Sequence, residues 1–230
     1  MRYEILYKGA FPIVECHLER GEAIKAESDA MVAMSPTCAV EGKTEGGLLG
    51  GLMRRAFTGE SFFLQRMVAK NGPGKVLFAH AQPGDIEALD LDGSVSLIVE
   101  KGGFLACTEG IEVNTKVQGL MQGLMSGEGF VLAKLTGTGT CFISTYGSIH
   151  TISLDPGEEF IIDNGHLVAW TDDCTYKMEK AAGFIDSLTS GEGMVCRFKG
   201  GNSGSSVVFI QTRNPESFKE WINSMVPAKD

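Results

Sequence analysis

Three glutamates recur at one fixed place along the chain, and their spacing makes them the first candidates for shared chemistry. Each closes a ten-residue block that opens with Gly, continues with two large apolar residues and ends in Ser or Thr, Gly and Glu; the three are Glu60, Glu128 and Glu192. Carboxylates gathered by a repeat could line a pore or a ligand groove, whereas a turn carboxylate accepts backbone N–H bonds. The sequence leaves both interpretations open, so these residues are weak ligand-binding candidates.

The same blocks carry a pair of apolar residues directly after the opening Gly. The six residues are Leu52, Met53, Leu120, Met121, Phe184 and Ile185. Such residues are either plugs of the core between repeats or an exposed, adaptable surface for a partner or a membrane. They are candidates for an interaction surface, with the buried alternative left open.

Other residue types that carry chemistry lack the necessary spacing. The four histidines (His17, His80, His150 and His166) lie far apart, without the paired spacing of a metal-binding β-helix, and we interpret them as surface or strand residues. No G-x-S-x-G, P-loop or local Cys–His signature occurs, and Gly137-Thr138-Gly139 predicts a β-turn rather than a nucleotide loop. The sequence therefore predicts no catalytic residue, no metal, no cofactor and no enzymatic activity.

The cysteines and the N-terminus bear on the cellular compartment. The six cysteines are scattered and form no C-x-x-C pair. The stretch Met1–Lys8 carries an acid and no apolar run of signal-peptide length, and no window approaches the roughly 18 consecutive apolar residues of a membrane span. We expect reduced thiols in or near the core of a cytoplasmic protein.

The charge balance bears on the choice of partner. The chain has 29 acidic and 20 basic residues, a formal net charge of −9. Because Lys and Arg that neutralise phosphates supply most non-specific affinity for nucleic acids, a surface of this sign repels them. The sequence predicts no nucleic-acid partner and leaves peripheral membrane contact possible.

A second block repeats in step with the first and indicates how the elements are organised. An acid is followed by a polar or small turn, two apolar residues, Ala, a variable residue and Ser or Thr, starting at Glu27, Glu100 and Asp163. Both blocks recur about every 65 to 70 residues, a longer period than the about 20 to 50 residues of common solenoids and propellers. This pattern predicts three small β modules in series. The modules cover residues 1–80, 81–150 and 151–230.

Each module also offers strands on either side of turns. The strand pairs expected around Gly-rich turns are residues 62–68 with 76–79, 130–135 with 140–144, and 194–198 with 207–210. In the first module the polar turn at Ser28-Asp29 fits a hairpin.

The chain closes with a clear helix signal. Asn214 suits the N-cap, Pro215 the first helical position and Pro227 the stop, and the apolar residues between them recur at helical spacing. We predict an amphipathic helix over Pro215–Val226 that docks on the last module.

Several stretches carry a resemblance to a known family. The chain, from Tyr3-Glu4-Ile5 through Phe57–Phe63 and Gly103–Ala106 to Phe209–Arg213, resembles bacterial relatives of the Altered Inheritance of Mitochondria family whose mitochondrial member carries the number twenty-four. The resemblance runs essentially end to end. It implies an all-β fold of three tandem modules in pseudo-threefold repeat. Each would be a short double-stranded β-helix similar to the tryptophan RNA-binding attenuator protein (TRAP-like), with one C-terminal α-helix added.

The resemblance also implies an assembly, because TRAP-like single-module chains form rings of roughly nine to eleven modules. A row of three β modules leaves strand edges open at both ends, and head-to-tail contact between identical chains would close them into a ring. We expect a homotrimer that acts as a non-catalytic binding or scaffold protein for an unknown protein or small-molecule partner. The alternatives are a small-molecule enzyme on a double-stranded β-helix and a membrane-surface adaptor.

Overall fold

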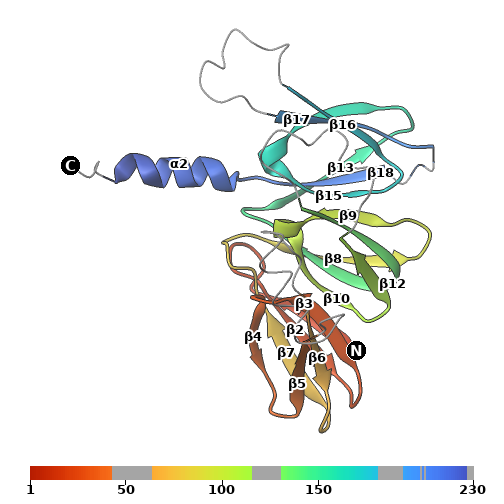
Figure 1. The fold of residues 1–230 in the computed structure, drawn as a ribbon, viewed down its shortest axis with the longest axis vertical. Helices are drawn as coiled ribbons and strands as arrows, with labels where there is room; N and C mark the ends of the chain where they lie inside the picture. Colours follow the sequence, from red (N-terminus) through yellow and green to blue (C-terminus); the bar gives the residue numbers. More distant parts are fainter. Residues whose placement is uncertain (43–63, 116–130, 181–193, 203, 205, 227–230) are drawn as a thin grey trace, which may run out of the picture.

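The computed structural model describes residues 1–42, 64–115, 131–180, 194–202, 204 and 206–226. These residues form β-strands almost throughout, followed by one C-terminal α-helix, α2 (Pro215–Met225) (Figure 1). The expectation of an all-β protein with one C-terminal helix is therefore confirmed, and the helix begins at the predicted residue.

The strands fall into three consecutive units. The first unit contains β1 (Arg2–Leu6), β2 (Ile13–Leu18), β3 (Ala23–Glu27), β4 (Met31–Met34), β5 (Cys38–Gly42), β6 (Leu64–Ala69) and β7 (Gly74–Phe78). The second contains β8 (Ile86–Asp92), β9 (Leu97–Glu100), the 3-10 turn η1 (Lys101–Gly103), β10 (Phe104–Thr108), β11 (Ile111–Asn114) and β12 (Leu132–Ser144). The third contains β13 (Ile149–Leu154), β14 (Glu159–Asp163), the 3-10 turn η2 (Asn164–His166), β15 (Leu167–Thr171), β16 (Thr175–Lys180), β17 (Met194–Lys199) and β18 (Ser206–Gln211).

One antiparallel pairing scheme recurs in the three units. In the first unit β7 pairs with β2 and β4, and β6 pairs with β3 and β5. In the third, β18 pairs with β13 and β15, and β17 pairs with β14 and β16. In the second, one long strand, β12, takes the place of both central strands. Its C-terminal half pairs with β8 and β10, and its N-terminal half pairs with β9 and β11.

Two strand pairings join the units to one another. β3 of the first unit pairs with β10 of the second, and β9 of the second pairs with β15 of the third. An eleven-stranded sheet therefore runs through all three units, which stack in a column with the first unit at the bottom of Figure 1. We call these two pairings the first joint and the second joint.

The buried apolar residues form three clusters, and each cluster draws on two neighbouring units. The first-unit cluster is completed by Leu105 and Phe142 of the second unit. The second-unit cluster includes Val168 and Phe209, and the third-unit cluster includes Ile98 from β9. No unit closes its core alone, because part of its apolar surface is covered by a neighbouring unit.

Several local expectations were wrong. Ser28-Asp29 does not close a hairpin, because β3 and β4 on either side of it pair with other strands and not with each other. Gly137-Thr138-Gly139 is not a β-turn but lies inside β12. Gly137 and Gly139 have positive φ angles of 102° and 149°, which glycine adopts readily, and they lie where β12 changes partners from β11 to β8.

The C-terminal helix does not dock on the third unit as predicted. None of its residues is buried, and it projects sideways from the column (Figure 1). A ring contact between Tyr146 and Phe218, with centroids 5.7 Å apart, lies near its start. An amphipathic sequence indicates that one helix face will be covered, but not by which molecule.

The predicted module boundaries remain a prediction. The boundary after residue 80 falls between β7 and β8, whereas the boundary after residue 150 falls within β13.

Candidate functional site

A cleft of about 450 Å³ lies at the boundary between the first and second units. Its walls come from three segments that are far apart in sequence: the turn between β3 and β4, the stretch after β7, and η1 with the start of β10. The charged and titratable side chains that line it are Glu27, Asp29, His80, Glu100 and Lys101. The cleft therefore combines three carboxyl groups, one imidazole and one ammonium group.

His80 supplies an unused hydrogen-bonding atom. Its Nδ1 is buried and has no hydrogen-bond partner in the part of the chain that the structure describes. Burial lowers the pKa of His80, and a backbone hydrogen bond with Gln82 opposes the shift without cancelling it. The lowered pKa keeps the ring neutral at pH 7, and its buried Nδ1 is a polar atom whose hydrogen-bonding capacity is unused among the described residues.

The pKa of the Glu27 carboxyl group is shifted upward, whereas that of His80 is shifted downward. Burial raises the pKa of its carboxyl group, the charge of Lys101 acts to lower it, and the charge of Asp29 raises it further. A neutral imidazole and a carboxyl group with a raised pKa suit the binding of a small polar molecule. None of the described residues that line the cleft is a Ser, Thr or Cys.

The repeated acids that begin the second sequence block have a structural role in two units. The Glu100 carboxylate accepts a hydrogen bond from the Gly102 backbone N–H at 2.7 Å, and that of Asp163 accepts one from Gly165 at 2.9 Å. Each caps a 3-10 turn, which explains why an acid precedes a turn of small residues at both places.

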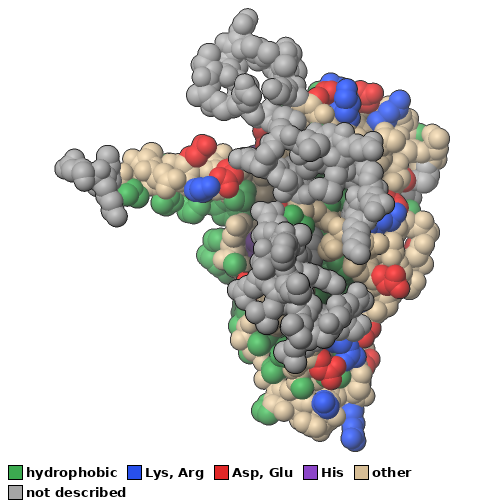
Figure 2. Space-filling view, viewed as in Figure 1, with side chains coloured by type: hydrophobic (Ala, Val, Ile, Leu, Met, Phe, Trp, Pro, Cys, Tyr) green, Lys and Arg blue, Asp and Glu red, His purple; other side chains and the backbone are tan. Residues whose placement is uncertain are grey.

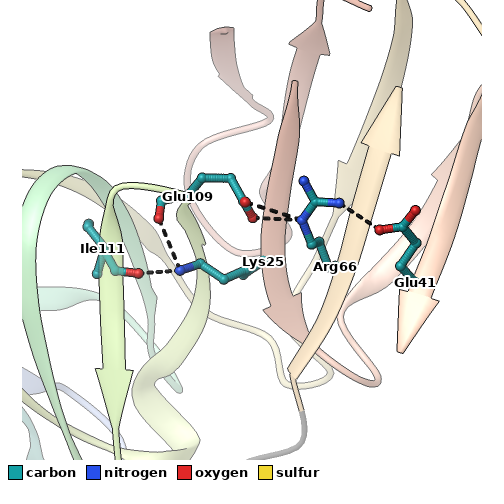
Figure 3. Close-up of polar contacts among 5 residues, drawn as sticks. All are labelled: Lys25, Glu41, Arg66, Glu109 and Ile111. Atoms are coloured by element: carbon teal, nitrogen blue, oxygen red, sulfur yellow. Dashed lines mark hydrogen bonds and ion pairs between the residues drawn. The ribbon is translucent and has the colours of Figure 1, made fainter. Parts of the chain in front are cut away.

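The first joint is reinforced by a polar network (Figure 3). Arg66 on β6 binds the Glu109 carboxylate across the joint through Nε, at 3.1 and 3.2 Å, and Glu41 of its own unit through a terminal nitrogen at 2.7 Å. The Lys25 ammonium group donates to the backbone carbonyls of Glu109 and Ile111. Burial acts to lower the pKa of Arg66, but these carboxylates outweigh it and raise the pKa.

The second joint has an equivalent ion pair. Lys134 lies 2.7 Å from Asp172, which occupies the place after β15 that Glu109 occupies after β10. Asp172 also accepts a hydrogen bond from the Ser96 backbone at 3.0 Å. Burial alone would raise the pKa of Asp172, but the hydrogen bonds from Lys134 and Ser96 outweigh burial and lower it. Both joints thus place a cation and an acid across the paired strands.

A second candidate surface is the apolar face of α2. Phe218, Trp221, Ile222 and Met225 recur at helical spacing and are all exposed. Figure 2 shows hydrophobic side chains along the underside of α2, and others along the side of the first unit where β4 lies. Contiguous exposed apolar surface of this kind marks an interaction site.

The candidate residues from the repeated Gly–Glu blocks lie outside the described residues. They are Glu60, Glu128 and Glu192 with Leu52, Met53, Leu120, Met121, Phe184 and Ile185. In sequence, the three blocks fall between β5 and β6, between β11 and β12, and between β16 and β17. In sequence order, each block therefore precedes β6, β12 or β17.

Sequence reasoning missed the cleft. His80 was interpreted as a surface or strand residue, and nothing near it in sequence links it to Glu27 or Lys101. The acid that begins each second block was the available signal, since Glu27 and Glu100 both line the cleft.

The described residues also bear on metal binding, thiol chemistry and membrane spanning. Among the described residues there is no group of three or more His, Cys, Asp or Glu side chains that could hold a metal ion. All six cysteines are free and buried, as expected for thiols in the core. No helix in the described ranges is long and apolar enough to cross a membrane.

The fold defines an all-β protein built from strand-paired units in a row, with one projecting amphipathic helix. The family described as Mitochondrial biogenesis AIM24 matches residues 3–213, and the chain belongs to this family. An uncharacterized protein of Streptococcus pyogenes serotype M6 is 31% identical over 234 residues, covering 99% of this chain and 92% of that protein. A crystal structure of a protein from Streptococcus pyogenes matches with a TM-score of 0.77 and 30% identity, covering 98% of this chain and 99% of that one. The family resemblance noted in the sequence is thereby confirmed.

Proposed function

We propose that the protein is a non-catalytic binding scaffold of the cytoplasm that assembles head to tail into a ring of three chains. The observation that carries the proposal is that units of this chain join by pairing one strand edge to another, and they do so twice in succession. A row built in this way ends in one unused edge at each end. Identical chains can satisfy both edges by repeating the same contact.

The number of chains follows from the proposed nature of the units. We interpret each unit as a TRAP-like module, a short double-stranded β-helix, as the resemblance implies. Rings of such modules contain roughly nine to eleven, so three chains of three modules would supply nine. The net charge of −9 argues against nucleic acid as the partner of such a ring.

Light scattering on the full-length protein at micromolar concentration is expected to give about 74 kDa, three times the chain mass of 24.6 kDa. A mass of 24.6 kDa would overturn the ring. A dimer of about 49 kDa would indicate two-fold pairing of the edges instead. Native mass spectrometry of the same sample would also detect a small molecule retained in the cleft. If the protein were instead an enzyme that acts on a small molecule, the reaction would take place in this cleft.

A membrane-surface adaptor is a second candidate, favoured by the exposed apolar face of α2. An amphipathic helix lies in a membrane interface through such a face, usually with Lys and Arg on its polar side. Here the polar side carries Glu216, Lys219 and Glu220, an acidic balance that gives no attraction to anionic lipid. Binding would therefore depend on apolar burial alone.

Sedimentation with phosphatidylcholine vesicles tests this candidate. If the adaptor function holds, the parent protein pellets with the vesicles and the double variant Ile222→Asp/Met225→Asp does not. Ser224→Asp is the matched control, because Ser224 is exposed on the same helix and is not part of the apolar set. Recovery of the parent protein in the supernatant would reject the membrane candidate.

A further inference from the structure

Two strands at opposite ends of the column lack a partner on one side. In the described part of the chain, β4 of the first unit is hydrogen-bonded to β7 alone, and β14 of the third unit to β17 alone. Their counterparts elsewhere have partners on both sides: β10 pairs with β12 and β3, and β9 pairs with β12 and β15. The contact that forms each joint is thus the one contact missing at each end.

The unused edge of β4 is apolar where an ordinary edge strand would be charged. Val32 is 54% exposed, whereas Leu105 and Val168 at the same position of β10 and β15 are buried. Met34 is 37% exposed, and both of its counterparts are buried. Edge strands that remain exposed to solvent usually carry charges or proline, which block pairing with another chain. The composition of β4 is instead that of a strand paired on both sides.

The unused edge of β14 also exposes apolar residues, which lie between the acidic Glu159 and Asp163 that begin and end the strand. Phe160 is 43% and Ile161 is 42% exposed. Their counterparts in β9, Leu97 and Ile98, are buried where β9 meets β15. The apolar residues of β14 therefore match residues that are buried in the second joint.

The shape of β4 is already suited to such a contact. Its pairing with β7 shifts register between Met31 and Ala33. The pairing of β10 with β12 shifts register between Phe104 and Ala106, and the pairing of β15 with β18 shifts register between Leu167 and Ala169. A β-bulge re-aims the strand that contains it, and here it recurs in all three strands of this type.

The two joints also share one register. In the first, Ala106 lies opposite Ala26 and Cys107 opposite Lys25. In the second, the equivalent residues Ala169 and Trp170 lie opposite Val99 and Ile98. The same alignment places Ala33, Met34 and Ser35 of β4 opposite Ile162, Ile161 and Phe160 of β14.

We propose that β14 of one chain pairs antiparallel with β4 of a second copy in this register, forming an intermolecular third joint. The inference rests on the proposed head-to-tail assembly and assigns its interface. One chain carries both edges on units at opposite ends of the column (Figure 1), so the contact is heterologous and each chain gives one edge and receives one.

The third joint differs from the other two in its charges. Pro36 follows β4 at the place where Glu109 and Asp172 follow β10 and β15. Arg197, the counterpart of Arg66, is bonded to Glu179 of its own unit at 2.7 Å. The intermolecular joint therefore lacks the ion pair of the internal joints, and apolar contact dominates it. Assembly should persist in 1 M salt, where exposed ion pairs are screened.

Disulfide trapping tests the register directly. In the double variant Met34→Cys/Ile161→Cys, the two new thiols of one chain lie at opposite ends, so mild oxidation can join only different chains. Opposed residues of an antiparallel pair have Cα atoms about 4.5 to 5.5 Å apart, within the range of a disulfide. We expect covalent dimers and trimers on a non-reducing gel, with nothing larger because a ring of three closes.

Three matched proteins make the result decisive. In Met34→Cys/Glu159→Cys one thiol is displaced by two residues along β14. This variant should give at most about one tenth of the covalent dimers and trimers that Met34→Cys/Ile161→Cys gives. Neither single variant should cross-link, because the contact is heterologous. Covalent dimers from a single variant would mean two-fold pairing and would overturn the proposal.

A substitution separates this interface from assembly in general. Ile161→Lys should reduce the mass in light scattering to 24.6 kDa without changing the circular dichroism, because Ile161 is exposed in the single chain. Val40→Lys, at a similarly exposed residue of β5 away from both edges, should leave the assembly intact. A trimer that survives Ile161→Lys and gives no disulfide ladder would retain the proposed ring but overturn this interface. A monomeric parent protein would overturn both.

Discussion

Replacing Trp170 with alanine is expected to lower the free energy of unfolding by about 3 to 5 kcal/mol. Trp170 is 1% exposed and lies opposite Ile98 in the second joint. Its ring contacts those of Tyr176 and Phe198, with centroids 5.1 and 5.4 Å apart. Truncation would leave a cavity at the point where the second and third units meet, and closely packed neighbours cannot fill it.

Urea unfolding at a fixed protein concentration measures the effect, and the second tryptophan provides the control. Trp221 on α2 is 54% exposed, so Trp221→Ala should change the free energy of unfolding by no more than about 0.5 kcal/mol. If Trp170→Ala were as stable as Trp221→Ala, the second joint would not be a packed part of the core.

Four of the native thiols are expected to react with iodoacetamide at pH 8 about a thousandfold more slowly than a free thiol. Burial raises the pKa of Cys16, Cys107, Cys141 and Cys196 to about 12. At pH 8 about one such thiol in ten thousand is ionised, against about one in four for an unperturbed cysteine, and only the thiolate reacts. Exclusion of the reagent by the core slows the reaction further.

Mass spectrometry of samples taken over time would count the labelled thiols. Val40→Cys, which introduces a thiol at an exposed position of β5, should gain one label within minutes while Cys16, Cys107, Cys141 and Cys196 stay unlabelled. In urea above the unfolding midpoint all should react. Rapid labelling of any of the four in the folded protein would show that its unit opens frequently.

The sequence predicted the elements of this fold better than their partners. The pairs of strands beside the Gly-rich turns of the first and third units were located closely, and the cap and start of α2 were correct. These features are local, since propensity, a cap and a proline act over a few residues.

The errors all concern long-range placement. β3 and β4 are adjacent in sequence with a polar turn between them, yet each has its partners further along the chain. The Gly-rich stretch in β12 has turn composition, but the Gly110 carbonyl accepts the Thr138 N–H at 3.2 Å and keeps the strand continuous. A Cβ on Gly137 would lie 2.2 Å from the Gly110 oxygen, so glycine permits a close approach here rather than a reversal.

The cleft could not be predicted for a related reason. His80, Glu27 and Lys101 come from three segments; the pairing of β4 with β7 brings the first two together, and the strand pairing of the first joint adds the third. The spacing of these residues along the sequence does not indicate that they are neighbours in the fold.

The order of strand pairing has a consequence for how the chain acquires its structure during synthesis. Apart from the joints and the Gly84–Gly147 bridge, strand pairs form within one continuous stretch, residues 2–78, 86–144 or 149–211. The first stretch can complete its own pairings before the second has left the ribosome, because N-terminal segments emerge first. Until the second stretch emerges, the core of the first unit lacks Leu105 and Phe142, which pack against it in the folded protein. The first and second units therefore each expose an apolar edge during synthesis until the next unit arrives to cover it.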